Sequence, residues 1–226
     1  IEKLGNHYKI ERSELVKYNS KNPVNKQNLE KSKSVYLNSL KGTIYVVSGL
    51  PRSGTSMMMQ MLKSGGANIF TDGKREADLN NPKGYLEHEA VKSLSKNKSI
   101  LRKAEGKVVK VVSPQLKNLL PSYKYKLIFM DRNIEEVITS QHKMTGKEEK
   151  NYPIKLHNFY KSQLEDLEKT FLNLLNIDSI RIGFKEAIEQ PEKVAEKVSA
   201  FLSELNLDAN KMASAIDVNL YRNKVN

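Results

Sequence analysis

The sequence contains no cysteine, so the chain can form neither a disulfide nor a thiolate-bound metal site. It also lacks any apolar run of about 18 residues, and we therefore expect no membrane-spanning helix. The four histidines show no metal-ligand spacing, and the beginning of the chain carries no secretory pattern. The first residue is Ile1 rather than Met, which leaves the native N-terminus open, while the missing cysteine fits a reducing, cytoplasmic compartment.

Positive charge is what the sequence has in excess. Lys and Arg number 38 against 26 Asp and Glu, which gives a formal net charge of +12 and a pI near 9.6. Such an excess concentrates anions near the protein, whether a nucleotide, an acidic acceptor or a nucleic acid. The basic residues match no usual nucleic-acid-binding signature, which argues against that partner. A solvated surface rich in Lys and Asn explains the same charge equally well.

The chain divides into a polar beginning and an alternating remainder. Residues 1–41 are rich in Lys and Asn, show helical patterns over 10–18 and 28–40, and predict a helical lead-in rather than a separate domain. The expected strands are 43–47, 108–112, 125–130 and 179–182, with a shorter one at 67–70. One helix is expected to begin near Gly54, and four others are expected over 87–97, 133–142, 154–175 and 191–205. This alternation predicts one domain over 42–226, a three-layer α/β/α fold with a central parallel sheet.

A glycine-containing turn follows the first predicted strand. Gly49 and Gly54 have the GxxxxG spacing of a phosphate-cradling loop, in which backbone N–H groups and a helix N-terminus favour an anion. In the nucleoside-triphosphate version a Lys follows the second Gly, but Thr55 stands there and the positive charge is Arg52, inside the loop. A donor with one phosphate and one sulfuryl group has less charge to neutralise and needs no metal. The alternative is an ordinary turn between strand and helix.

The segment Ser48–Leu62, SGLPRSGTSMMMQML, resembles the 5′-phosphosulfate loop of sulfotransferases that use 3′-phosphoadenosine 5′-phosphosulfate (PAPS). Its Pro-Arg-Ser-Gly-Thr form is closest to that of bacterial and tyrosylprotein sulfotransferases. The resemblance implies a P-loop NTPase-like sulfotransferase fold, PAPS as co-substrate and no metal. It also implies that Arg52 contacts the bridging oxygen of the donor. The loop residues expected to bind the donor are Pro51, Arg52, Ser53, Gly54, Thr55 and Ser56.

A second anion site is expected at the end of the strand 125–130. Arg132 follows this strand and Ser140 lies eight residues later, an arrangement similar to the 3′-phosphate site of the family. An Arg fork suits a phosphate dianion, although a capping Arg and a solvent-facing Ser would look the same. Resemblance further implies that Phe184 contacts the adenine and that Arg222 takes over a phosphate contact. Asp131 offers a competing interpretation, because an acidic residue at this strand end resembles the magnesium-holding strand of P-loop NTPases.

Lys110 stands on an otherwise apolar predicted strand. Strand alternation places Lys110 on the face of Val108 and Val112, with Val109 and Val111 on the other face. A Lys inside a sheet is unfavourable unless it is paired with an anion, so we expect it to contact the donor. A Lys that reaches solvent at the strand end is the alternative.

The general base is harder to assign. Cytosolic sulfotransferases carry a His two positions after this Lys, but Val112 stands there. Tyrosylprotein sulfotransferases resemble the chain in the loop and use a carboxylate about one helix beyond it. Asp72 is nearest in spacing, with Glu76 and Asp78 as alternatives and His88 as a weaker candidate. A carboxylate can act as base where its surroundings raise its pKa toward the working pH.

These patterns together predict a sulfotransferase that moves a sulfuryl group from PAPS to a hydroxyl or amine by in-line displacement. The acceptor is not readable from the sequence and stays open among small molecules, carbohydrates and peptides. Two alternatives remain at this stage. The first is a P-loop kinase acting on a small molecule, and the second is a non-catalytic polyanion-binding module on the same fold.

Overall fold

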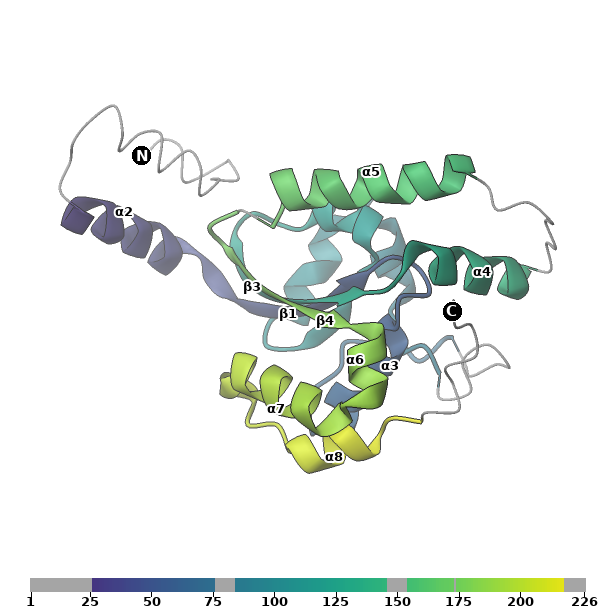
Figure 1. The fold of residues 1–226 in the computed structure, drawn as a ribbon. Helices are drawn as coiled ribbons and strands as arrows, with labels where there is room; N and C mark the ends of the chain where they lie inside the picture. Colours follow the sequence, from purple (N-terminus) through teal and green to yellow (C-terminus); the bar gives the residue numbers. More distant parts are fainter. Residues whose placement is uncertain (1–25, 76–83, 146–153, 173, 218–226) are drawn as a thin grey trace.

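A four-stranded parallel sheet forms the centre of the computed structural model, which describes residues 26–75, 84–145, 154–172 and 174–217. Its strand order is β2-β1-β3-β4, and every neighbouring pair is parallel. The strands are β1 (Lys41–Gly49), β2 (Val108–Lys110), β3 (Tyr123–Asp131) and β4 (Ile177–Gly183). Helices cover both faces of the sheet (Figure 1), so the predicted three-layer α/β/α fold is confirmed.

Strand β1 shows why the sheet is buried on both sides. Its residues from Ile44 onward are buried, and the first four of them alternate between two large hydrophobic clusters. Ile44 and Val46 belong to one cluster, whereas Tyr45 and Val47 belong to the other. This is the period of two that an extended chain imposes, applied to a run with no polar face.

The two helical layers are unequal. Figure 1 shows α4 (Ile134–Thr145) and α5 (Ile154–Thr170) above the sheet. The same face carries Leu94, which directly follows one short 3₁₀ helix, and Leu101, which lies in another, and both pack into the cluster of Ile44. The layer below consists of α3 (Thr55–Ser64), α6 (Phe184–Glu189), α7 (Pro191–Phe201) and α8 (Ala209–Ser214).

The helix expected over 87–97 is wrong. The structure has the 3₁₀ helices η1 (Glu89–Ser93) and η2 (Lys98–Ala104) instead. The side chains of His88 and Asn97 each accept a backbone N–H bond from two residues later, so each turn starts at its own cap. Local caps of this kind compete with a continuous α-helix, because they hold the backbone outside helical geometry.

Other boundaries differ by smaller amounts. The strand expected at 67–70 is reduced to a single bridge between Ile69 and Val108. The helix expected over 191–205 ends at Phe201 and is followed by the 3₁₀ helix η4 (Ser203–Leu205). A further 3₁₀ helix, η3 (Ser113–Asn118), follows β2. The helices α6 and α8 were not predicted, and the helical pattern over 10–18 lies outside the described residues.

The helix α2 (Lys26–Ser39) corresponds to the second half of the predicted lead-in. It extends away from the sheet (Figure 1) and joins β1 directly. Its end is anchored, since the buried Tyr36 packs in a small cluster with Leu175. None of the described helices is long and apolar enough to cross a membrane.

Candidate functional site

The turn between β1 and α3 holds two residues in the left-handed region of backbone conformation. Arg52 and Gly54 both adopt positive φ, at 69° and 99°, and the N–H of Ser53 bonds the carbonyl of Leu50 at 3.1 Å. Helix α3 then begins at Thr55, and no side chain caps it. The first N–H groups of a helix have no partner within the helix, so an uncapped start presents them to a ligand. The helix predicted to begin near Gly54 is thereby confirmed.

Both loop glycines are required by close packing. A Cβ on Gly54 would lie 2.5 Å from Cδ2 of Phe184, and one on Gly49 would lie 2.6 Å from the carbonyl oxygen of Met130. Distances below about 3 Å force the neighbouring atoms to move, and a side chain at positive φ adds strain. The loop therefore packs closely against Met130 near the end of β3 and against Phe184 at the start of α6.

Three buried hydroxyl groups lie at the same edge of the sheet. Ser48 is at the end of β1, Ser53 is in the loop and Ser113 follows β2, and each is at most 1 % exposed. Their Oγ atoms have no hydrogen-bond partner among the described residues. A buried hydroxyl without a partner is unfavourable by about 1–3 kcal/mol, so this edge is suited to a polar ligand that would supply the missing bonds.

Arg52 joins the loop to the second predicted anion site. Its Nε donates to Oγ of the buried Ser140 at 3.0 Å, and its own carbonyl oxygen accepts a bond from Nη1 of Arg132 at 2.9 Å. Nη1 of Arg52 also lies 3.7 Å from the sulfur of Met144. Both Ser140 and Arg132 lie 80 or more positions from Arg52 in the sequence, yet the structure brings each into direct contact with it.

Arg132 is held in place from two sides. Its Nε donates to Oε2 of Glu136 at 2.9 Å, and both side chains are less than a tenth exposed. The guanidinium also lies over the ring of Phe184, 4.1 Å from its centroid. Glu136 is not among the residues predicted from the sequence, although its i,i+4 spacing from Arg132 at the start of a helix is a signal for such a pair. Adenine contact by Phe184, whose ring is buried here, stays a prediction.

A pocket of about 560 Å³ opens beside this pair, at the carboxyl ends of β3 and β4. Its volume lies within the range of roughly 300–1,000 Å³ that is usual for small-molecule sites. The lining residues come from these strand ends, from α5 and from the starts of α4 and α6. They are Asp131, Arg132, Asn133, Ile134, Glu136, Leu164, Gly183, Phe184 and Lys185.

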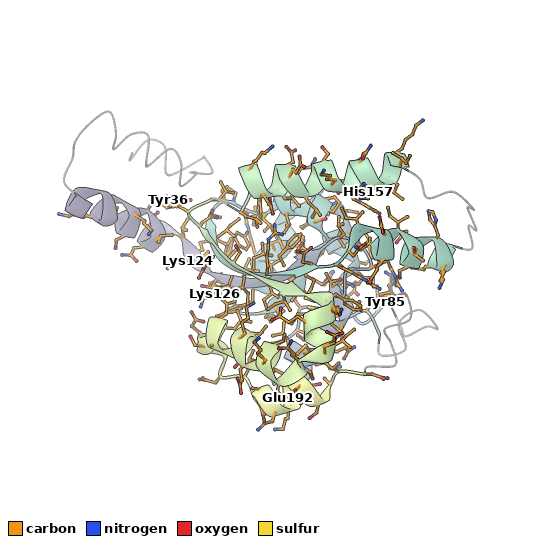
Figure 2. All side chains as sticks on the ribbon, viewed as in Figure 1. Tyr36, Tyr85, Lys124, Lys126, His157 and Glu192 are labelled. Carbon is orange, nitrogen blue, oxygen red and sulfur yellow. The ribbon has the colours of Figure 1, made fainter. Side chains whose placement is uncertain are left out.

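Lys110 lies on the α3 side of the sheet, and this confirms the face predicted for it. Its Nζ donates to Oγ of Ser56 in the first turn of α3 at 2.9 Å and to the carbonyl of Tyr85 at 3.5 Å. The same atom lies 3.4 Å from Oε2 of Glu87. Figure 2 shows Tyr85 on the side of the molecule where β3 and β4 end, opposite Lys126 near the beginning of β3.

Glu87 is a residue of this site that the sequence analysis missed. Its carboxylate is 9 % exposed and pairs with Lys110, Arg75 and the more exposed Lys92. The guanidinium of Arg75 also stacks on the ring of Tyr85, 3.4 Å from its centroid. A carboxylate so deeply enclosed is stable only with such partners. No local pattern marks Glu87, because two of its partners, Arg75 and Lys110, come from other segments of the chain.

Charge and burial act against each other in this cluster. Burial lowers the pKa of Lys110, and the neighbouring Glu87 carboxylate opposes that change without cancelling it. Burial alone would raise the pKa of Glu87, but the positive charges of Lys110 and Arg75 outweigh it, so the pKa falls below its ordinary value. Glu87 is therefore an ionised carboxylate at neutral pH.

Asp72, the first candidate for the general base, anchors the segment that follows α3. Its two oxygens accept hydrogen bonds from the backbone N–H groups of Glu89, at 2.9 Å, and Lys74, at 3.2 Å. His88 lies 3.6 Å from the same carboxylate and stacks on Phe70. Burial acts to raise the pKa of Asp72, but the backbone N–H bonds lower it overall, which makes it a weaker base.

The remaining predicted residues are placed as follows. Pro51 and Gly54 are half-buried in the loop, and Thr55, which replaces the Lys of nucleoside-triphosphate-binding loops, is 5 % exposed. Glu76, Asp78 and Arg222 lie outside the described residues. The structure thus brings Arg52, Arg132 and Ser140 together at the edge of the sheet where the strands end. Lys110 on β2 contacts Ser56 in the first turn of α3.

No protein-family model and no curated protein matches the chain. The solved structures that it resembles include a sugar kinase from Janibacter sp. HTCC2649, with 14% identity, a TM-score of 0.40, and 72% of this chain and 95% of that chain covered. They also include the sulfotransferase domain from the curacin biosynthetic pathway, with 14% identity, a TM-score of 0.39, and 80% and 84% covered. Likeness at this level leaves the choice of activity to the site itself.

Proposed function

We propose that the chain is a transferase that acts through the β1–α3 loop, and more specifically a sulfotransferase that uses PAPS. The observation that carries the proposal is the contact chain from Ser140 through Arg52 to Arg132. It supports one ligand with two separated anionic groups, one at the loop and one at the end of β3. A nucleotide with a 5′-phosphosulfate and a 3′-phosphate has that character.

Each part of the donor has candidate partners. The 5′-phosphate would accept N–H groups from the uncapped start of α3, together with the hydroxyls of Ser53, Thr55 and Ser56. The 3′-phosphate would take donors from Arg132 and Ser140, because a guanidinium fork suits a phosphate dianion. The pocket beside Phe184 has room for the adenosine portion.

The proposed reaction is an in-line displacement at sulfur. The acceptor oxygen or nitrogen forms the new bond to sulfur, while the bond from sulfur to the bridging oxygen breaks. The electron pair of that bond leaves with 3′-phosphoadenosine 5′-phosphate, and the acceptor proton passes to a carboxylate base. Arg52 and Lys110 would stabilise the charge that develops on the leaving phosphate, which makes a metal unnecessary. Asp72 and Glu76 stay the candidates for the base.

A kinase acting on a small molecule is the second candidate, and Asp131 is the observation that favours it. This residue ends β3, where P-loop NTPases hold magnesium, and its carboxylate is half-exposed. Thr55 weighs against the kinase because the Lys that would span the phosphates is missing. Asp131 is also drawn to Arg181, whose Nη1 lies 3.7 Å away.

Ligand-dependent thermal unfolding separates the two candidates. We expect 3′-phosphoadenosine 5′-phosphate to raise the Tm and ATP with Mg²⁺ to leave it unchanged, because stabilisation follows from binding to the folded state. Arg132→Ala should abolish the shift, whereas Arg102→Ala, which removes an equal charge from the exposed surface of η2, should preserve it. A shift with ATP and Mg²⁺ alone would support the kinase.

Transfer of label from PAPS to an acceptor panel then tests the reaction. The panel should hold phenols, sugars, amines and acidic peptides, since the acceptor class is open. Binding of the nucleotide without any turnover, together with heparin binding that weakens steeply with salt, would favour the non-catalytic polyanion-binding module.

A further inference from the structure

The pair formed by Lys110 and Glu87 is buried more deeply than a surface salt bridge. The two side chains are 7 % and 9 % exposed, and Nζ of Lys110 lies between Oε2 of Glu87 at 3.4 Å and Oγ of Ser56 at 2.9 Å. The ammonium therefore bridges a carboxylate and the first turn of α3. That first turn is where the proposed donor would place its phosphate.

The charged groups around Lys110 are unevenly divided. Three charged side chains act on it, and they come from the segment that follows α3 and from η1. Glu87 favours the ammonium form, whereas Arg75 and Lys92 disfavour it. The ring and carbonyl of Tyr85 complete the enclosure on that side, and Ser56 contributes only a hydroxyl from α3.

We propose that Glu87 is a positioning residue, which holds the Lys110 side chain as an ammonium and directs it toward Ser56 before the donor arrives. The geometry supports this role because the carboxylate and the hydroxyl both contact the same nitrogen. Burial and two nearby cations act against the ammonium form and lower the pKa of Lys110. A neutral amine could not stabilise negative charge that develops on a leaving phosphate. The effect on turnover rests on the proposed function, whereas the charge state of Lys110 does not.

Two other roles for Glu87 make different predictions. A general base would lose its function in Glu87→Gln at every pH, and the acid side of the rate profile would disappear. A purely structural pair would lower stability and also move the pH at which Lys110 titrates, but the ratio of wild-type to variant turnover would not change with pH. A positioning role changes the alkaline side of the rate profile, because Lys110 then loses its ammonium form at a lower pH in the variant.

The charge state is measured directly by NMR on the full chain with isotope-labelled lysine. The signal of Lys110 is assigned from its absence in Lys110→Arg, and its titration midpoint is followed with pH. We expect the midpoint to move to lower pH in Glu87→Gln and to return toward the wild-type value in Glu87→Asp. Lys92→Ala should move it the other way, since that variant removes an opposing charge. An unchanged midpoint in Glu87→Gln overturns the proposal.

The rate profile tests the consequence for catalysis. With labelled PAPS, the ratio of wild-type to Glu87→Gln turnover should grow by about tenfold per pH unit once the pH exceeds the variant midpoint. A ratio that is constant with pH contradicts the positioning role. If wild type transfers no label while the NMR midpoint still moves, the proposed function fails and the assignment of Glu87 stands.

Removal of one partner from a buried pair can unfold a protein. Thermal unfolding of each variant therefore accompanies both measurements, and Glu204→Gln serves as the matched control. Glu204 pairs with Lys126 far from this edge, at a half-exposed carboxylate. It should leave the Lys110 midpoint and the rate profile as in wild type, and a shift in this control would show that any lost carboxylate has the same effect.

Discussion

The substitution Gly54→Ala tests the packing that shapes the loop. Gly54 precedes α3 with φ at 99°, and an added Cβ would lie 2.5 Å from Cδ2 of Phe184. The variant therefore carries two separate penalties, one for the backbone and one for the contact. Gly66 offers a matched control, because it also has φ at 99° but no atom within 4 Å of an added Cβ.

The two penalties can be assigned magnitudes. A side chain held at positive φ lowers the free energy of unfolding by about 1–3 kcal/mol. Overpacking against a well-packed ring lowers it by about another 1–3 kcal/mol. Gly54→Ala should then lose about 2–6 kcal/mol in total, whereas Gly66→Ala should lose only the first amount. For a chain of this length each kcal/mol corresponds to a change in Tm of about 2–4 °C.

Thermal unfolding with a double-mutant cycle measures the contact alone. Phe184→Leu removes the ring, so the combination of Gly54→Ala with Phe184→Leu should lose at least about 1 kcal/mol less than the sum of the two single variants. Equal losses for Gly54→Ala and Gly66→Ala, together with strict additivity in the cycle, would refute the reasoning. The loop would then not be pressed against the start of α6.

Three further outcomes follow from the site. Arg52→Ala and Lys110→Ala should each lower turnover of labelled PAPS by about 10²-fold, as expected for a lost charge-stabilising contact, and full activity in either would contradict the proposed roles. Ser140→Ala should weaken binding of 3′-phosphoadenosine 5′-phosphate in titration calorimetry more than it weakens binding of adenosine 5′-monophosphate, which has no 3′-phosphate; equal losses for both nucleotides would show that Ser140 does not bind the 3′-phosphate. Burial acts to raise the pKa of Asp72, but two backbone N–H groups lower it overall, so its stabilisation is present above the unfolded pKa and lost as the pH falls through the folded pKa. Asp72→Asn should therefore be less stable than wild type at neutral pH, with the gap closing below about pH 4 in thermal unfolding; a gap independent of pH would exclude this role.

The sequence by itself determined the sheet and the loop. The strands 43–47 and 125–130 are runs of β-branched and apolar residues, and the structure extends them to Lys41–Gly49 and Tyr123–Asp131. Such runs need no knowledge of distant residues, because burial on both faces makes them continuously apolar. The spacing of Gly49 and Gly54 is equally local, since it reflects backbone angles that only a few residues accept.

Local patterns were less reliable where polar side chains compete with the backbone. The predicted helix over 87–97 failed because His88 and Asn97 each begin a short turn of their own. Helix propensity alone does not reveal such caps, which depend on the direction of one side chain. The helix expected over 191–205 ends earlier, at Phe201, because helix ends are the least determined part of an element.

Only the tertiary structure decided which charged and polar side chains come into contact. Arg52 lies against Ser140, and Lys110 lies against Glu87, although nothing in the local sequence connects either pair. These contacts exist because parallel strands end at one edge and bring distant loops together there. Burial of the second pair lowers the pKa of Lys110 and the Glu87 carboxylate opposes that change, and both effects exist only in the folded interior. An anion site after the first strand stays a prediction from the sequence, and the fold determines which side chains surround the loop there.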